Sequence, residues 1–153
     1  IHTFDVVGEM LHLVNKYDIP IKLLELEITE TADSEGVSDV VQKMKDAGFT
    51  MLMDDFGSGY SSLNMLQKTQ FDVLKIDRGF LSEFMESSRG RKIISHTISM
   101  SRDIGLDIIA EGVETPEQAS FLSDCGYDSA QGFYYSKPIT QEEFDKMLVE
   151  VNK

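Results

Sequence analysis

Apolar positions along the chain follow two spacings, which predict helices alternating with strands. In some segments they recur every three or four residues, as on one face of an α-helix, and in others every second residue or in short runs. The predicted helices cover residues 4–17, 34–47, a short stretch near 63–66, about 81–104 with a break near Gly90, 115–126, and a last helix from 140. The predicted strands cover residues 24–30, 50–55, 71–77, 107–111 and 128–131.

The order of these elements indicates the fold class. Each of the five predicted strands is followed by a helical segment, and no linker or low-complexity stretch divides the chain. Strands that alternate with helices form a parallel sheet covered by helices, which is an α/β fold. We therefore expect residues 1–153 to form a single domain.

The same spacings assign side chains to faces of the predicted elements. Strand side chains alternate, so Met51, Met53 and Asp55 are expected on one face and Asp54 on the other. The residues expected to face inward from the long helical region are Ile93, Ile94, Thr97, Ile98 and Ser101.

Composition excludes several classes of function. The net charge of −13 argues against binding of polymeric nucleic acid, which needs basic surfaces. The single cysteine, Cys125, excludes an intrachain disulfide and a cysteine-based zinc site, and no apolar run approaches the length of a membrane span. We therefore expect a cytoplasmic protein with no direct membrane contact.

Polar side chains stand at the end of every predicted strand. Parallel strands bring their carboxyl ends to one rim of the sheet, where α/β proteins place their active sites. Carboxylates that gather there would suit divalent cations, and a lysine beside them would suit metal-assisted hydrolysis. The polar strand-end residues are Glu27 and Glu30, Asp54 and Asp55, Lys75 and Asp77, Glu111 and Glu114, and Gln131.

The acidic pair has two other interpretations. Taken alone, Asp54-Asp55 with Gly57 and Gly59 reads as a solvated turn. A phosphoacceptor receiver domain also has an acidic pair, a metal and a lysine at strand ends. It needs its lysine on the last strand, however, whereas Lys75 lies in the middle of the chain.

Five motifs then resemble the EAL family, the bacterial phosphodiesterases of cyclic di-GMP. They occur in the family's order across essentially the whole chain. They are Leu26-Glu27-Ile28-Thr29-Glu30, Asp54-Asp55-Phe56-Gly57-Ser58-Gly59-Tyr60-Ser61-Ser62-Leu63, Leu74-Lys75-Ile76-Asp77, Ala110-Glu111-Gly112-Val113-Glu114 and Gln131-Gly132-Phe133. The resemblance implies a modified (β/α)8 TIM-type barrel that usually dimerises and hydrolyses cyclic di-GMP to linear pGpG with Mg²⁺ or Mn²⁺.

The resemblance also implies roles for individual residues. Glu27 and Asp54 match ligands of a first metal, and Asp54 and Asp55 match ligands of a second. Lys75 matches the residue that orients or polarises the attacking water. Glu111 matches an essential carboxylate beside that water. These residues are therefore the expected two-metal and catalytic set.

Four further residues match positions around that set. Gln131 matches a polar residue at the cluster of metals and water, and Glu30 matches the residue that anchors the loop after the acidic pair. Asp77 and Glu114 belong to the motifs and are expected near metal, water or substrate.

The chain departs from the family at its N-terminal side. The Glu-Ala-Leu motif and a strand bearing an asparagine, each of which supplies a metal ligand, do not occur in the 153 residues. A full barrel needs about 250 residues. We therefore expect a partial barrel of about five β/α units that lacks the N-terminal strands, and that by itself is weak or inactive as a phosphodiesterase.

Two alternatives follow from the missing ligands: a non-catalytic module that binds cyclic di-GMP or dimerises, and a purely structural piece. The expected partners are cyclic di-GMP, a second copy in a homodimer or oligomer, and an upstream sensory or GGDEF-type domain in the parent protein.

Overall fold

The structure is a computed structural model that describes residues 5–29, 31–32, 36–58 and 62–151. Its strands are β1 (Glu25–Thr29), β2 (Thr50–Phe56), β3 (Val73–Ile76), β4 (Asp107–Ala110) and β5 (Ser129–Ala130). Its helices are α1 (Val6–Tyr17), a 3₁₀ turn η1 (Ile21–Leu23), α2 (Val37–Asp46), α3 (Ser62–Lys68), α4 (Arg78–Met85), α5 (Ser88–Asp103), α6 (Pro116–Cys125) and α7 (Gln141–Val151).

The five strands form one parallel sheet in the order of the sequence, β1-β2-β3-β4-β5. This confirms the predicted α/β fold class with parallel strands. Among the described residues, β1 pairs with β2 alone and β5 with β4 alone, so each forms an edge of the sheet.

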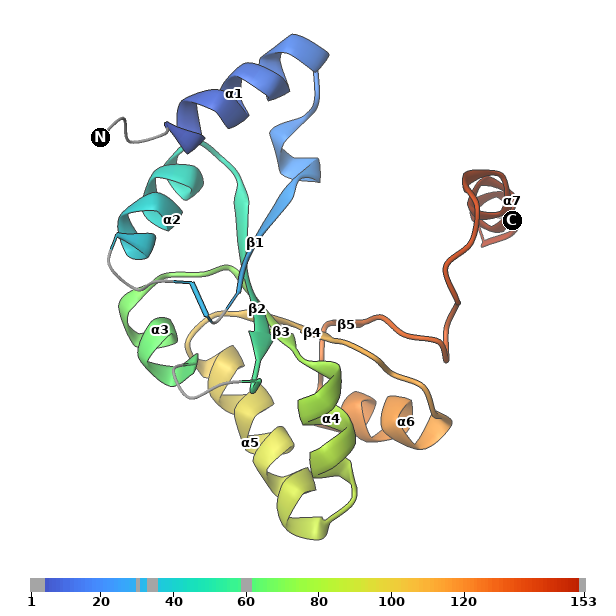
Figure 1. The fold of residues 1–153 in the computed structure, drawn as a ribbon. Coiled ribbons are helices and arrows are strands. Elements are labelled where there is room, and N and C mark those ends of the chain that lie inside the picture. The colour runs from blue at the N-terminus through green and yellow to red at the C-terminus, as the bar shows by residue number, and fades with distance from the viewer. Residues whose placement is uncertain (1–4, 30, 33–35, 59–61, 152–153) are drawn as a thin grey trace.

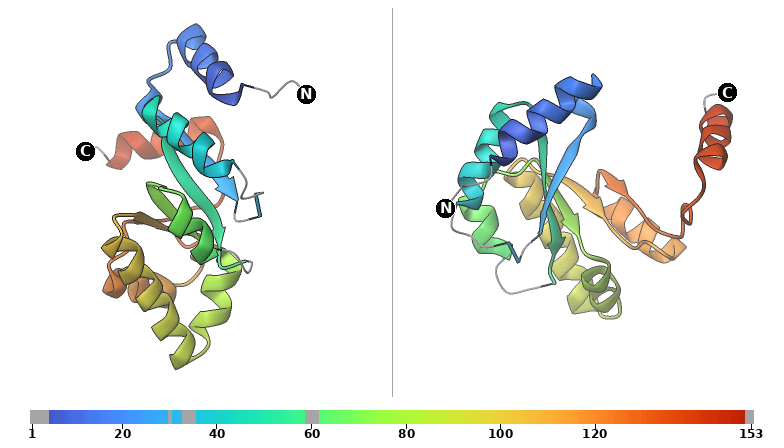
Figure 2. Two further views of the ribbon diagram at one scale, coloured as in Figure 1. Left: turned by 90° about the vertical axis from the view of Figure 1, so that its left-hand side faces the viewer. Right: turned by 45° about the horizontal axis from the view of Figure 1, so that its top comes forward.

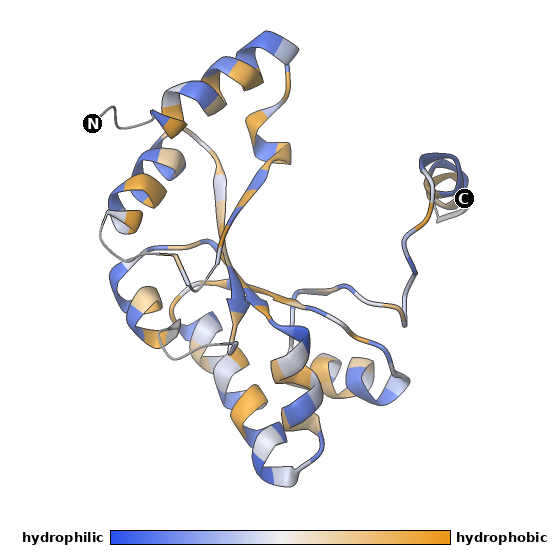
Figure 3. Cartoon of the chain, viewed as in Figure 1, coloured by the Kyte–Doolittle hydropathy of each residue, from blue (hydrophilic) through white to orange (hydrophobic). Residues whose placement is uncertain are grey.

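Helices α1 to α6 follow one side of the curved sheet, and α7 stands apart from them (Figures 1 and 2). Each helix carries an apolar and a polar face (Figure 3). The apolar faces of α1 to α6 pack on the strands in two clusters. One cluster centres on Met44, Met51 and Met53, and the other on Ile94 and Ile108. Both clusters lie between helices and strands, so the strand residues that belong to them face the helices.

The region predicted as one long helix with a break near Gly90 is two helices that meet at residues 86–87. Asp77 caps the start of α4 by accepting hydrogen bonds from the backbone N–H of Gly79 and Phe80. Ser87 caps α5 by accepting a hydrogen bond from the N–H of Gly90. The predicted break is confirmed, but it lies a few residues before Gly90, which is inside the first turn of α5.

Gly90 is required by close packing between the two helices rather than by a turn. A Cβ atom at this position would lie 2.0 Å from the backbone oxygen of Phe84 in α4. The predicted inward stripe of α5 is confirmed at Ile94, Ile98 and Ser101, which are fully buried. It was wrong at Ile93, which is 38% exposed because it lies at the flank of that stripe.

The predicted start and end of α6 are confirmed. The Thr115 hydroxyl accepts a hydrogen bond from the N–H of Gln118, and the Gln118 side chain accepts one from the N–H of Thr115. Pro116 begins the helix and Gly126 ends it in the left-handed conformation. This cap fixes where the chain turns after β4, and so helps to hold the loop that carries Glu111.

The last helix is the least packed of the described elements. Phe144 and Met147 of α7 are 50% and 44% exposed, and neither belongs to the two apolar clusters. Among the described helices, none is both long enough and apolar enough to cross a membrane.

Candidate active site

Strand alternation separates the polar residues from the core. In β1, Leu26 and Ile28 pack toward the cluster beneath the helices, so Glu27 between them points to the opposite face of the sheet. The same alternation in β3 buries Leu74 in that cluster and turns Lys75 to the opposite face. The face without helices therefore collects polar side chains near the carboxyl ends of the strands.

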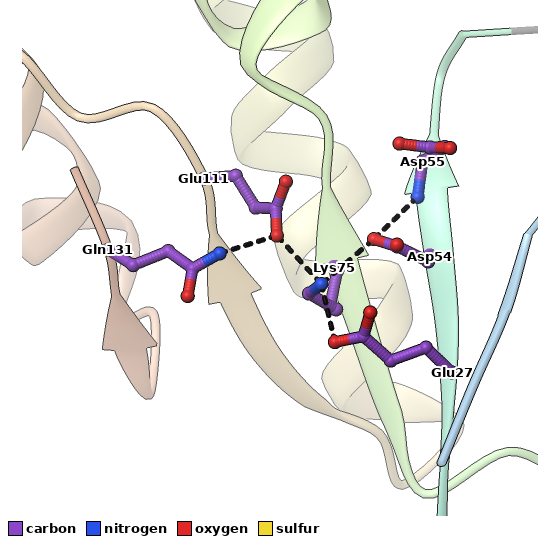
Figure 4. Close-up of polar contacts among 6 residues, drawn as sticks. All are labelled: Glu27, Asp54, Asp55, Lys75, Glu111 and Gln131. Atoms are coloured by element: carbon purple, nitrogen blue, oxygen red, sulfur yellow. Dashed lines mark hydrogen bonds and ion pairs between the residues drawn. The ribbon is translucent and has the colours of Figure 1, made fainter. Parts of the chain in front are cut away.

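Lys75 brings three carboxylates together on this face. Its Nζ atom lies 2.6 Å from Glu27 Oε1, 3.0 Å from Asp54 Oδ1 and 2.8 Å from Glu111 Oε1 (Figure 4). Glu27 comes from β1, Asp54 from β2, and Glu111 directly follows β4. Three strand ends that are distant in the sequence thus meet at one ammonium group.

Burial and pairing act in opposite directions on the charge of Lys75. Burial of the ammonium would lower the pKa of Lys75, but its hydrogen bonds to Glu111, Glu27 and Asp54 outweigh burial and raise the pKa above its ordinary value. Lys75 is therefore held in its charged form, with all three N–H donors directed at carboxylates.

Gln131 joins the cluster through Glu111. Its Nε2 atom donates a hydrogen bond to Glu111 Oε1 at 2.6 Å (Figure 4). The backbone supports this contact, because the N–H of Val113 donates to the carbonyl of Gln131 at 3.1 Å. Gly132 allows the two loops to approach this closely, since a Cβ atom there would lie 2.2 Å from the backbone oxygen of Val113.

Asp55 departs from the predicted alternation. Its backbone has a positive φ of 58°, and the pairing of β2 with β3 shifts between Met53 and Phe56. This irregularity returns Phe56 to the buried face that Met51 and Met53 share, so the expectation that Asp55 follows that face was wrong. The Asp55 carboxylate points away from Lys75 (Figure 4).

The adjacent carboxylates of β2 affect each other. Asp54 Oδ1 accepts a hydrogen bond from the backbone N–H of Asp55 at 2.9 Å. Burial, followed by the charge of Asp54, raises the pKa of the Asp55 carboxyl. A nearby positive charge would relieve this repulsion.

The donor set is of the kind that binds hard divalent cations. Glu27, Asp54 and Asp55 supply only carboxylate oxygens, the ligands that Mg²⁺, Mn²⁺ and Ca²⁺ prefer. Within the part of the chain that the structure describes, however, no group of three such side chains is arranged to hold a metal ion. The oxygens of Glu27 and Asp54 face Lys75 instead.

The remaining predicted residues lie around the cluster rather than in it. The Asp77 side chain caps α4. Glu114 pairs with Arg78 at 2.8 Å, and the aliphatic part of Arg78 packs against Gly112 in the same loop as Glu111. Sequence reasoning missed Arg78, whose signal is its place directly after the Leu74–Asp77 motif. Glu30 lies outside the described residues, as does part of the loop that it was predicted to anchor.

Comparison with known proteins identifies the family of the chain. A family model described as the EAL domain matches residues 2–138. Cyclic di-GMP phosphodiesterase NbdA of Pseudomonas aeruginosa is 33% identical over 146 residues, which is 94% of this chain and 19% of NbdA. The bifunctional diguanylate cyclase/cyclic di-GMP phosphodiesterase MucR of the same organism is 38% identical over 141 residues, or 90% of this chain and 21% of MucR.

Solved structures give the same result. The EAL domain of Mycobacterium smegmatis DcpA superposes with a TM-score of 0.87 at 33% identity, covering 98% of this chain and 69% of that chain. The PaMucR phosphodiesterase in complex with c-di-GMP superposes with a TM-score of 0.83, covering 94% of this chain and 59% of that chain. The chain thus spans about a fifth of the length of the curated relatives and about two thirds of these solved chains.

Proposed function

The chain belongs to the EAL domain family, and we propose that it is the C-terminal part of a metal-dependent phosphodiesterase domain that hydrolyses cyclic di-GMP to linear pGpG in second-messenger signalling. The observation that carries the proposal is the convergence of Glu27, Asp54 and Glu111 on Lys75, with Gln131 hydrogen-bonded to Glu111. A purely structural piece would not need a buried charge cluster of this kind, because such clusters are costly to desolvate.

We assign the reacting groups by their positions. Lys75 would donate a hydrogen bond to the attacking water and hold it in line with the phosphate. Glu111 would accept a proton from that water, and its hydrogen bond from Gln131 would fix the orientation of the carboxylate. The Arg78–Glu114 ion pair would hold the loop that carries Glu111.

Two divalent cations would be held, one by Glu27 and Asp54 and the other by Asp54 and Asp55, together with ligands from strands that precede them in the complete domain. When bound, Mg²⁺ or Mn²⁺ would supply Lewis-acid chemistry by lowering the pKa of a water and offsetting the negative charge of the phosphate. The predicted anchoring of the following loop by Glu30 belongs to the same proposal.

The parent protein would contain more than this chain. Complete EAL chains extend beyond the region covered here, and β1 and β5 are both open edges. We therefore propose that further strands close a (β/α)8 barrel, that the domain forms a homodimer, and that a sensory or GGDEF-type domain precedes it. The name of the relative MucR, a bifunctional diguanylate cyclase/phosphodiesterase, supports such a partner domain.

The direct test is chromatography of cyclic di-GMP incubated with the parent protein and with residues 1–153, in Mg²⁺ or Mn²⁺. We expect linear pGpG from the parent and little product from residues 1–153 alone. Hydrolysis by residues 1–153 at the rate of the parent would show that the missing ligands have no role. Absence of product with the parent would contradict the proposed activity.

The second candidate is a module that binds cyclic di-GMP or dimerises without catalysis. The pairing of Glu27 and Asp54 with the Lys75 ammonium favours it, because two of the proposed metal ligands already contact a cation. Calorimetry distinguishes the two functions, because this module would bind cyclic di-GMP in the presence of a chelator and leave it intact when Mn²⁺ is added.

A further inference from the structure

The Lys75 ammonium contacts more carboxylates than it would need in order to orient a water molecule. Its ammonium has three N–H donors, and Glu27, Asp54 and Glu111 each lie within 3.0 Å of it. The Lys75 side chain is 8% exposed, whereas its partners are 46%, 17% and 19% exposed, respectively. The ammonium therefore lies inside the cluster, with the carboxylates between it and the solvent.

The charges of the cluster are unbalanced. Glu27, Asp54 and Glu111 carry three negative charges, against the single positive charge of Lys75. In the described part of the chain, no other lysine or arginine forms an ion pair with these carboxylates, and Arg78 pairs with Glu114. Carboxylates held together repel one another, so the arrangement depends on a cation at its centre.

We propose that Lys75 is a built-in counter-cation: in the metal-free protein its ammonium occupies the space among Glu27, Asp54 and Glu111, keeps them gathered, and competes with divalent cations for their oxygens. The part that concerns metals rests on the proposed function, because Glu27 and Asp54 are the proposed ligands. When those oxygens bind a divalent cation instead, N–H donors of Lys75 become available to the attacking water. Lys75 thus has a positioning role before it has a catalytic one.

The first test measures the melting temperature of the parent protein in the presence of a chelator, so neither metal nor substrate takes part. Lys75→Met keeps an unbranched side chain only one atom shorter and removes the charge, which leaves three carboxylates facing one another. Loss of one partner from a buried ionic cluster is strongly destabilising, so we expect the melting temperature to fall by about 10 °C.

The chain offers a matched control at the opposite ends of the strands. Lys45 forms an ion pair with Asp72 at 2.7 Å and is 23% exposed. The Lys45→Met variant makes the same chemical change, but a more exposed pair is worth little, so we expect a fall of about 2 °C or less. Equal falls for the two variants would overturn the proposal.

A double variant separates charge from packing. Asp54→Asn removes one negative charge and leaves an oxygen that still accepts the hydrogen bond from the N–H of Asp55. Added to Lys75→Met, it should recover part of the lost melting temperature in the chelator. If the double variant melts no higher than Lys75→Met, or both are unfolded, the loss comes from packing and the proposal is wrong.

The second test adds Mn²⁺ to the parent protein. Without the competing ammonium, the Lys75→Met variant should bind Mn²⁺ about tenfold more tightly than the native protein in calorimetry. Mn²⁺ should also raise the melting temperature of the variant more than that of the native protein. Equal Mn²⁺ affinities would overturn the competition. Because neither test measures hydrolysis, a failed phosphodiesterase assay would reject the proposed activity and leave these results standing.

Discussion

Lys75, a single charged residue, connects three strands and accounts for most of the geometry of the candidate site. The sequence placed Lys75, Glu27, Asp54 and Glu111 at strand ends, and their convergence follows from parallel strands. The sequence did not show that Lys75 would contact all three carboxylates, because alternation fixes the face of a side chain and not its reach. Nor did it show that the backbone turns at Asp55 with a positive φ. That turn depends on the shift in the pairing of β2 with β3, which the sequence does not show.

At the residue scale, we predict that Asp54→Asn weakens Mn²⁺ binding to the parent protein. Asp54 is assigned to both metals. Loss of a group that only hydrogen-bonds to a metal ligand lowers metal affinity about 10- to 100-fold. Asp54 is itself an assigned ligand, so its loss should lower the affinity roughly 100-fold. Isothermal titration calorimetry measures the affinity, and Asp72→Asn, paired with Lys45 away from the site, is the control. Tight Mn²⁺ binding that is unchanged by Asp54→Asn would reject the assignment.

At the scale of elements, periodicity and capping residues were sufficient to predict most helices and strands. The capping box at Thr115 and the left-handed end at Gly126 were readable because each is a local pattern. The junction of α4 and α5 was predicted a few residues too late because Gly90 looks like a helix break. Its actual cause is contact with the backbone of Phe84, which no local pattern shows.

This contact makes Gly90→Ala a test of the packing between α4 and α5. A methyl group at Gly90 would meet the Phe84 backbone, which cannot move aside without shifting α4, so we expect a loss of about 1–3 kcal/mol in the free energy of unfolding. Ser99→Ala, at an exposed position of the same helix, should change it by less than about 0.5 kcal/mol. Denaturant unfolding measures both, and equal stability of the two variants would disprove the packing role.

At the scale of the whole molecule, the family motifs indicated a partial barrel, and the structure shows the consequence. Edge strands β1 and β5 offer unpaired backbone groups, and the apolar side chains of Phe144 and Met147 are half exposed on α7. The exposed position of α7 could not be predicted from its periodicity, because an apolar stripe shows which face will be buried and not what buries it.

We therefore predict that residues 1–153 alone either associate through their edges or are marginally stable. A longer chain that includes the preceding strands should be compact and melt at a higher temperature. Light scattering combined with thermal melting compares the two proteins. If residues 1–153 are monomeric and melt as high as the longer chain, the edges must be protected by contacts that the described residues do not show.

We propose that the Lys75 cluster carries out the hydrolysis of cyclic di-GMP. This role is tested by measuring kcat and cyclic di-GMP affinity for the native parent protein and for its Lys75→Ala and Glu111→Ala variants. Both residues are assigned to the attacking water, so we predict that each variant lowers kcat by roughly 100-fold or more and weakens substrate binding much less. Variants that keep the native kcat, or that lose binding and turnover equally, would contradict the roles assigned to Lys75 and Glu111.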